Sequence, residues 1–210
     1  MTNLSEKQLL YSKLELIKSK EIRAFVKVAL DNAPGYFWNL KASTSGKYHH
    51  GESLVQHILY TIEYGQAHLR MLVWYWDQET QDLFYAALFL HDIHRCGMDG
   101  REMTDEDGML RTDPLHPLYP GATLGRLEIP PEELPEKRWE EPFPCYRFSW
   151  FKKFQKAVVS HMGPWSPISE LNPMHDNGLS LRFHVFLVDY VVSRECQRTI
   201  VPELQEETHA

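Results

Sequence analysis

Apolar side chains recur along most of the chain with the three- and four-residue spacing of amphipathic helices. The first such segments predict helices within residues 4–30. Ser53 is placed to cap a long helix over residues 54–76, and Asp77 is placed to begin the next one, which should run to about residue 94. No alternation of apolar and polar residues, as a half-buried strand would require, stands out. The pattern therefore predicts an all-α fold.

The second half of the chain mixes helices with long loops. Residues 97–141 are rich in proline, glycine and acidic side chains, and only residues 119–127 have the pattern of a short helix. Two further helices are expected over residues 150–162 and 179–199, the first of which should end at Gly163-Pro164. We expect a helical bundle with its long loops on one face.

Size and composition indicate one soluble domain. The chain has 210 residues, 43% of them hydrophobic, which suffices for one sizeable core. We expect a single domain over 1–210, with its core at about 36–198 and a frayed tail at 203–210. No apolar stretch approaches the roughly 18 residues of a membrane helix, and the N-terminus lacks the pattern of a signal peptide. A cytoplasmic protein without a membrane partner is expected.

Charge and cysteine content argue against some classes of function. The formal net charge of -7 argues against binding to duplex nucleic acid, which requires clustered lysine and arginine. Cys96, Cys145 and Cys196 are widely spaced without a CxxC pair, so we expect reduced thiols and neither a disulfide framework nor a zinc-thiolate site. Histidine is unusually frequent, with 11 residues. The positions of these histidines therefore become important.

Several ionisable side chains lie within apolar helical segments, where burial without a partner is costly. Each can be explained separately by hydrogen bonds within the core, which is the usual situation of one buried polar group. One metal site explains them together, because imidazole nitrogens and carboxylate oxygens suit divalent first-row metals. These residues are His57, His91, Asp92, His161 and Asp189.

The order His57, His91-Asp92, Asp189 resembles the H...HD...D signature of the HD-domain metal-dependent phosphohydrolases, an all-α superfamily in which these residues bind a metal. The similarity covers most of the chain. The segment 42–49, followed by SLVQH, is also similar to the sequence before the first metal-binding histidine in a subgroup that includes exoribonuclease-like proteins. The resemblance implies an HD-domain helical bundle with long loops on the active-site face.

The resemblance also implies a second metal ion. Binuclear members supply further ligands between the HD pair and the last aspartate, where this chain has His116 and His161. The implied ligands are His57, His91, Asp92 and Asp189 for one ion, and Asp92, as a bridge, with His116 and His161 for the other. The expected cofactors are two divalent transition-metal ions, Fe, Mn, Co or Ni, with Mg or Zn as alternatives.

Two such ions would activate water, as hydroxide, for attack on phosphorus and would stabilise charge on the leaving oxygen. Asp92, Arg95 and Lys47 are expected to serve catalysis. Arg95 stands where many relatives have a lysine, three residues after the HD aspartate. The expected substrate contacts are Lys47, Tyr48, His49, His94, Arg95, Trp165 and Arg194, whereas His68, His175 and His184 are expected to be surface or packing residues.

The expected function is metal-dependent hydrolysis of phosphate ester or anhydride bonds in a nucleotide or a similar small phosphorylated substrate. A di-iron oxygenase with the same ligands and an exonuclease-like 3'-5' phosphodiesterase are the enzymatic alternatives. A third alternative is a binding module whose metal is structural or whose pocket senses a nucleotide. An oxygenase would require iron and consume O2, and a binding module would bind its ligand without turnover. The sequence also allows a homo-oligomer.

Overall fold

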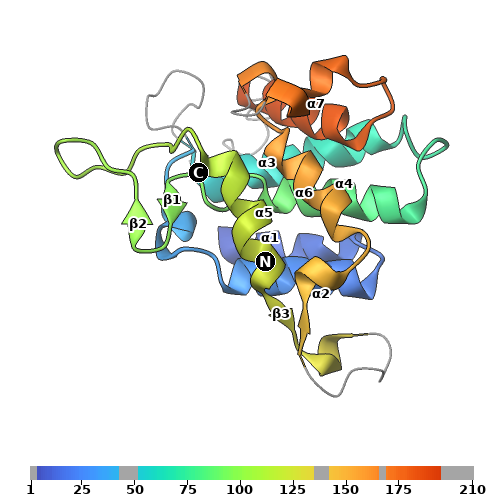
Figure 1. Ribbon diagram of the computed structural model, residues 1–210, viewed down its shortest axis with the longest axis horizontal. Coiled ribbons are helices and arrows are strands. Elements are labelled where there is room, and N and C mark those ends of the chain that lie inside the picture. Colours follow the sequence, from blue (N-terminus) through green and yellow to red (C-terminus); the bar gives the residue numbers. More distant parts are fainter. Residues whose placement is uncertain (1–3, 43–51, 135–141, 166–168, 195–210) are drawn as a thin grey trace, which may run out of the picture.

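The structure is a computed structural model that consists largely of helices (Figure 1). It describes residues 4–42, 52–134, 142–165 and 169–194. The predictions that fall outside these ranges concern Lys47, Tyr48, His49, Cys196, all but the first residue of the segment 42–49, residues 195–199 of the last predicted helix and the tail 203–210. Within the described ranges no closed sheet is formed, so the predicted all-α fold is confirmed.

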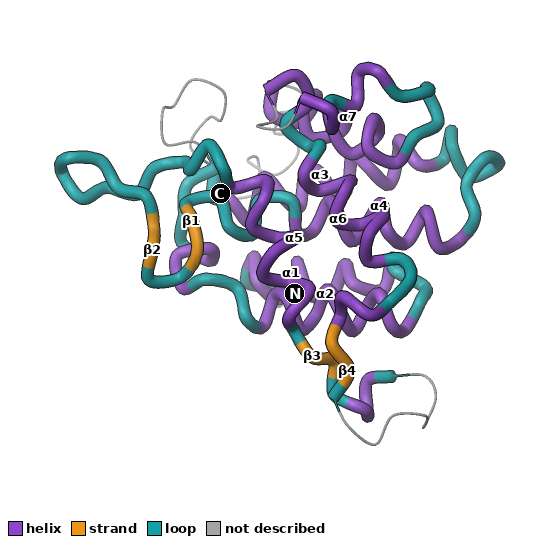
Figure 2. The backbone as a smooth tube through the Cα atoms, viewed as in Figure 1, coloured by secondary structure: helices purple, strands orange, loops and turns teal. Residues whose placement is uncertain are grey.

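The helices are connected by loops and short 3-10 turns. The α-helices are α1 (Glu6–Ser12), α2 (Lys20–Asp31), α3 (Leu54–Leu69), α4 (Gln78–Leu90), α5 (Tyr119–Thr123), α6 (Phe151–Val159) and α7 (Leu181–Arg194). Two antiparallel pairs of two-residue strands, which the sequence pattern did not predict, are β1 (Gly97–Met98) with β2 (Arg101–Glu102) and β3 (Glu128–Ile129) with β4 (Phe143–Pro144). Both pairs lie at the edge of the helical bundle (Figure 2). Two residues are too few for an alternating pattern to be recognised.

The predicted starts of α3 and α4 are confirmed by their capping residues. The Ser53 hydroxyl accepts a hydrogen bond from the backbone N–H of Gln56 at 3.0 Å, and the Gln56 side chain accepts one from the Ser53 N–H at 3.1 Å. Asp77 accepts a hydrogen bond from the N–H of Thr80 at 2.8 Å. These bonds satisfy N–H groups that have no partner within the helix.

Both helices end earlier than predicted. α3 ends at Leu69, and the chain continues to Trp76 in hydrogen-bonded turns. α4 ends at Leu90, after which the N–H of Arg95 donates to the carbonyl of Asp92 at 3.0 Å in a tight turn. The apolar pattern did not separate turn from helix here, because the inward-facing residues continue through both.

α4 lies at the centre of the bundle, where it packs against α2, α3, α6 and α7. Every residue from Leu83 to Leu90 is buried. A helix that is surrounded by other helices has no polar face, which explains its uninterrupted apolar sequence. The chain leaves α4 at His91, so the polar residues that follow begin inside the core.

Asp82 fixes the N-terminal segment to this central helix. Its fully buried carboxylate accepts hydrogen bonds from the backbone N–H groups of Lys18 at 2.9 Å and Ser19 at 2.7 Å. The side-chain amide of Gln78 donates a third at 3.0 Å. Ser19 is the N-cap of α2, so one carboxylate determines where that helix begins relative to α4.

Replacement of Asp82 by alanine should lower the free energy of unfolding by about 2–3 kcal/mol, because two partly buried backbone N–H groups lose a charged acceptor. Urea denaturation measures this change. The control is Glu79→Ala on the same helix, which removes a surface ion pair with Lys153 and should cost less than about 0.5 kcal/mol. Equal losses in the two variants would contradict the role of Asp82.

Candidate metal centre

The fold brings the six predicted metal ligands to one place. His57 lies within α3, His91 follows the last residue of α4, and Asp92 comes directly after it. The remaining three come from later elements: His116 from the 3-10 turn His116–Leu118, His161 from the turn after α6, and Asp189 from α7. Five of the side chains are at most 3% exposed, and that of Asp189 is 15% exposed. The cluster therefore lies almost entirely within the core.

The first group of donor atoms combines α3, α4 and α7. The Nε2 atom of His57 lies 3.4 Å from Nε2 of His91 and 3.2 Å from Oδ1 of Asp189. Nε2 of His91 lies 3.5 Å from the same Asp189 oxygen and 3.8 Å from Oδ2 of Asp92. Donors of a metal with bonds of about 2.1 Å are themselves about 3.0–3.4 Å apart. Two of the four distances lie in this range and two are slightly longer, and His57, His91 and Asp92 form a buried group that could hold a metal ion, with Asp189 beside it.

The second group joins Asp92 to His116 and His161. Oδ1 of Asp92 lies 3.1 Å from Nε2 of His116 and 3.5 Å from Nε2 of His161. The two Nε2 atoms are 3.2 Å apart. These three distances also match the spacing of donors around one metal ion. The buried histidine and aspartate cluster can therefore bind metal through two groups that share Asp92.

Backbone carbonyls orient three of the rings. His91, His116 and His161 each direct Nδ1 at the carbonyl three residues earlier, at 3.0, 2.7 and 2.6 Å. A carbonyl oxygen only accepts, so Nδ1 carries the proton and Nε2 of the neutral ring presents a lone pair. The facing Nε2 atoms of His116 and His161 then cannot hydrogen-bond each other. A cation beside them satisfies both lone pairs.

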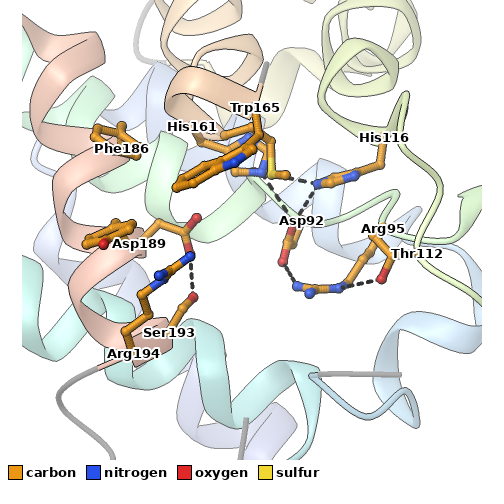
Figure 3. A pocket seen from close by; sticks show the side chains of 12 residues that line it. Asp92, Arg95, Thr112, His116, His161, Trp165, Phe186, Asp189, Ser193 and Arg194 are labelled. Carbon is orange, nitrogen blue, oxygen red and sulfur yellow. Dashed lines mark hydrogen bonds and ion pairs between the residues drawn. The ribbon is translucent and has the colours of Figure 1, made fainter. Parts of the chain in front are cut away.

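The carboxylate of Asp92 divides its two oxygens between its neighbours. Oδ1 faces His116 and His161, whereas Oδ2 faces His91 and forms an ion pair with the Arg95 guanidinium. Figure 3 shows Asp92 between the imidazole of His116 and the guanidinium of Arg95. With one oxygen toward each group of candidate metal ligands, the carboxylate of Asp92 is oriented to take part in both groups.

The local charges favour a cation in the first group. Burial disfavours the charged form of His91, but Asp92 and Asp189 overcome it and raise the pKa of His91 to about 9. Burial would likewise raise the pKa of Asp189, yet His91 and His57 hold that pKa well below its usual range. In the second group, burial lowers the pKa of His116. Without a metal, His91 therefore holds a proton at neutral pH, and a metal ion would replace that proton, because metals bind the neutral imidazole and the ionised carboxylates.

A cavity of about 350 Å³ opens onto the cluster. Its lining includes ligands from both groups and two arginines. Arg95 is oriented by Asp92 and by a hydrogen bond from its Nε to Oγ1 of Thr112 at 3.4 Å. The lining residues are Asp92, Arg95, Thr112, His116, His161, Met162, Trp165, Phe186, Asp189, Tyr190, Ser193 and Arg194. Both groups of candidate metal ligands can thus be reached by a small molecule in this cavity.

An aromatic wall borders this cavity. The rings of Trp165 and Tyr190 are stacked, with an interplanar angle of 8° and centroids 6.2 Å apart. The guanidinium carbon of Arg194 lies 5.4 Å from the Trp165 ring centroid and 4.6 Å from that of Tyr190. Trp165 is 57% exposed, so a large part of its ring is available for contact.

The remaining described histidines lie outside the cluster and its cavity. His94 does not line the cavity, since its Nε2 lies 2.7 Å from the Thr123 hydroxyl, and burial lowers its pKa to about 4. His68 and His184 are buried against each other, with Nε2 and Nδ1 2.8 Å apart, whereas His175 is exposed. These last three are packing and surface residues, as expected.

Sequence reasoning missed several cavity residues. Tyr190 follows Asp189 directly, and Ser193 is one helical turn further, where its hydroxyl donates to Asp189 Oδ1 at 3.3 Å. Because both residues lie next to the predicted ligand Asp189 on a predicted helix, the sequence could have indicated that they line the cavity. Thr112 lies in a loop, and no local pattern marks it.

Comparisons with protein-family models, curated proteins and solved structures found no match for this chain. The chemistry of the site therefore has to carry any functional assignment. None of the described helices combines the length and apolar character needed to cross a membrane.

Metal analysis tests the two groups separately. Protein purified without chelator should contain about two transition-metal ions per chain, and His116→Ala should retain about one, because the first group stays intact. Elemental analysis by mass spectrometry measures this ratio. His175→Ala, which alters an exposed histidine, is the control and should retain both ions. Absence of metal from the wild-type protein after reconstitution, or loss of both ions in His116→Ala, would contradict the arrangement.

Proposed function

We propose that the protein is a metal-dependent phosphohydrolase that cleaves ester or anhydride bonds of a small phosphorylated substrate. The observation that carries this proposal is the pair of buried donor groups sharing Asp92 in a cavity that is also lined by Arg95 and Arg194. The cluster is compatible with the HD-type site that the sequence resembles. Its chemistry supports both metal binding and contact with phosphate oxygens.

The residues divide the chemical work. Bound divalent ions supply Lewis acidity, which lowers the pKa of water and stabilises charge on phosphoryl oxygens. Asp92 would compensate the positive charge of ions bound in either group of donors. Together with the histidines that the backbone carbonyls orient, it fixes the geometry of the donors. Arg95 and Arg194 offer guanidinium groups to the phosphate, which a planar fork of donors suits. The apolar core around the cluster limits access of bulk water.

The aromatic wall favours a nucleotide among small phosphorylated substrates. Trp165 presents an exposed ring beside the metal ligands, and nucleobases stack on such rings. The cavity, at about 350 Å³, is at the small end of ligand pockets, which favours a mononucleotide over an oligonucleotide. The exonuclease alternative is correspondingly less favoured.

One feature supports an oxygenase as a second candidate. Asp92, His116 and His161 form a group of two histidines and one carboxylate, which is the ligand set of many non-haem iron oxygenases. Anaerobic assays separate the two activities. Phosphate release without O2 by the manganese or cobalt protein would support the hydrolase. Iron-dependent O2 uptake without phosphate release would show instead that the protein is an oxygenase.

Asp92→Asn should abolish metal binding and reduce phosphohydrolase activity by several orders of magnitude, because an amide coordinates poorly and brings no negative charge. Arg95→Ala should retain the metals and weaken substrate turnover, because guanidinium binds phosphate but does not ligate metal. Elemental analysis and a phosphate-release assay measure both properties. Near wild-type hydrolysis by Asp92→Asn would refute the shared-carboxylate site, and metal loss in Arg95→Ala would refute the separation of roles.

Trp165→Ala should raise KM for nucleoside monophosphates by about 5- to 150-fold, since stacking on one base contributes about 1–3 kcal/mol. It should leave turnover of ribose 5-phosphate, which has no base, unchanged. Trp74→Ala is a matched control, because Trp74 is 90% exposed and does not line the cavity. Equal effects of Trp165→Ala on the two substrates would show that the ring does not recognise a base.

A further inference from the structure

The turn between α3 and α4, residues 70–76, presents a concentration of exposed apolar side chains. Met71 is 64% exposed, Val73 44%, Trp74 90% and Tyr75 68%. With about 200 Å² of side-chain surface each, Trp74 and Tyr75 alone expose about 300 Å². Figure 2 shows this connection as a loop at the right-hand edge of the molecule. Apolar patches of this extent are at the lower end of the largest ones on a monomer, which are often functional.

The turn is held in place by two buried residues, Leu72 within it and Trp76 at its end. Leu72 and Trp76 are 6% and 8% exposed, so they anchor the turn in the core. The Trp76 indole N–H donates to the carbonyl of Leu179 at 2.8 Å, and its ring packs edge-to-face against Phe84. Backbone bonds such as Val73 N–H to the Leu69 carbonyl, at 3.0 Å, complete the turn. The exposed side chains therefore project from a fixed backbone.

The charges around the turn favour a second copy of the same chain as the partner. Arg70 precedes the apolar residues and Asp77 follows them, with Trp74 near the midpoint of the sequence between the two. Within the described residues neither Arg70 nor Asp77 forms an ion pair. A two-fold axis near Trp74 would place each Arg70 toward Asp77 of the other copy. In this arrangement the surface would be complementary to itself in charge and apolar character, while Asp77 keeps its hydrogen bond with Thr80.

Other features of the surface agree with a protein partner. Tryptophan, tyrosine and methionine are the residues enriched at the centre of protein interfaces, and charged residues belong to the rim. A lipid surface is less suited, because binding to membranes is usually supported by several lysines or arginines. The turn has only Arg70, and the whole chain has a net charge of -7.

We infer that the turn formed by residues 70–76 is the centre of a two-fold homodimer interface, with Trp74 packed near the axis and Arg70 facing Asp77 of the other copy. Asp77 caps the first turn of α4, whereas His91 follows its last residue. The 13 residues of this helix separate the two ends by about 20 Å. The interface therefore leaves the metal cluster and its cavity open in both copies.

Sedimentation equilibrium of the full chain, over a concentration series that reaches the high micromolar range, tests the interface. The wild-type protein should show a monomer–dimer equilibrium, and Trp74→Ala should raise its dissociation constant by about 30-fold. Arg70→Glu should raise it by about tenfold in low salt, and less in high salt, because it places like charges together. Trp165→Ala is the matched control and should dimerise like the wild type.

Three results would overturn the proposal. One is a wild-type chain that stays monomeric throughout the series. The second is a dimer that Trp74→Ala leaves unchanged, which would place the interface elsewhere. The third is a monomeric chain that sediments with phosphatidylcholine vesicles and loses this binding in Trp74→Ala, which would identify a lipid surface as the partner. Because Trp74 is almost fully exposed and distant from the cluster, none of these outcomes depends on catalytic activity.

Discussion

The buried carboxylate of Asp92 is the constraint on which the rest of the site depends. An ionised group inside an apolar core is costly unless opposite charges and hydrogen bonds compensate it. Here Oδ1 lies toward His116 and His161, and Oδ2 lies toward His91 and Arg95. His91 and Arg95 belong to the same segment as Asp92, whereas His116 and His161 come from later elements, so those elements must meet the end of α4. The chemistry of one side chain thus determines much of the packing around it.

The loops after α4 make this convergence possible. The N–H of Asp113 donates to the carbonyl of Arg95 at 2.8 Å, which ties the returning loop to the segment beside Asp92. His116 follows three residues later, and its Nδ1 lies 2.7 Å from the Asp113 carbonyl. Asp113 therefore connects the two parts of the chain through its backbone. A segment whose composition marked it only as loop has a specific role in positioning a ligand.

The sequence predicted features that depend on local chemistry and missed those that depend on tertiary contacts. The starts of α3 and α4 were predictable because Ser53 and Asp77 bond to N–H groups three residues away. The candidate ligands were recognisable because polar residues are conspicuous in apolar helices and because their order resembles a known signature. The side-chain direction of His94 was not predictable, since its hydroxyl partner, Thr123, is 29 residues away in sequence. The stacking of Tyr190 on Trp165 was not predictable either, since the two rings are 25 residues apart in sequence.

Arginine at position 95 has a physical consequence that a lysine would not reproduce. The guanidinium bonds Asp92 through Nη1 while its Nε donates to the Thr112 hydroxyl at 3.4 Å. A lysine ammonium is a single point of contact on a flexible stem, whereas the planar guanidinium fixes the direction of both bonds. With Oδ2 held in this way, Oδ1 remains directed at His116 and His161. Arg95 therefore orients the shared carboxylate and also presents a cation to the cavity, which places its positive charge beside the candidate metal ligands.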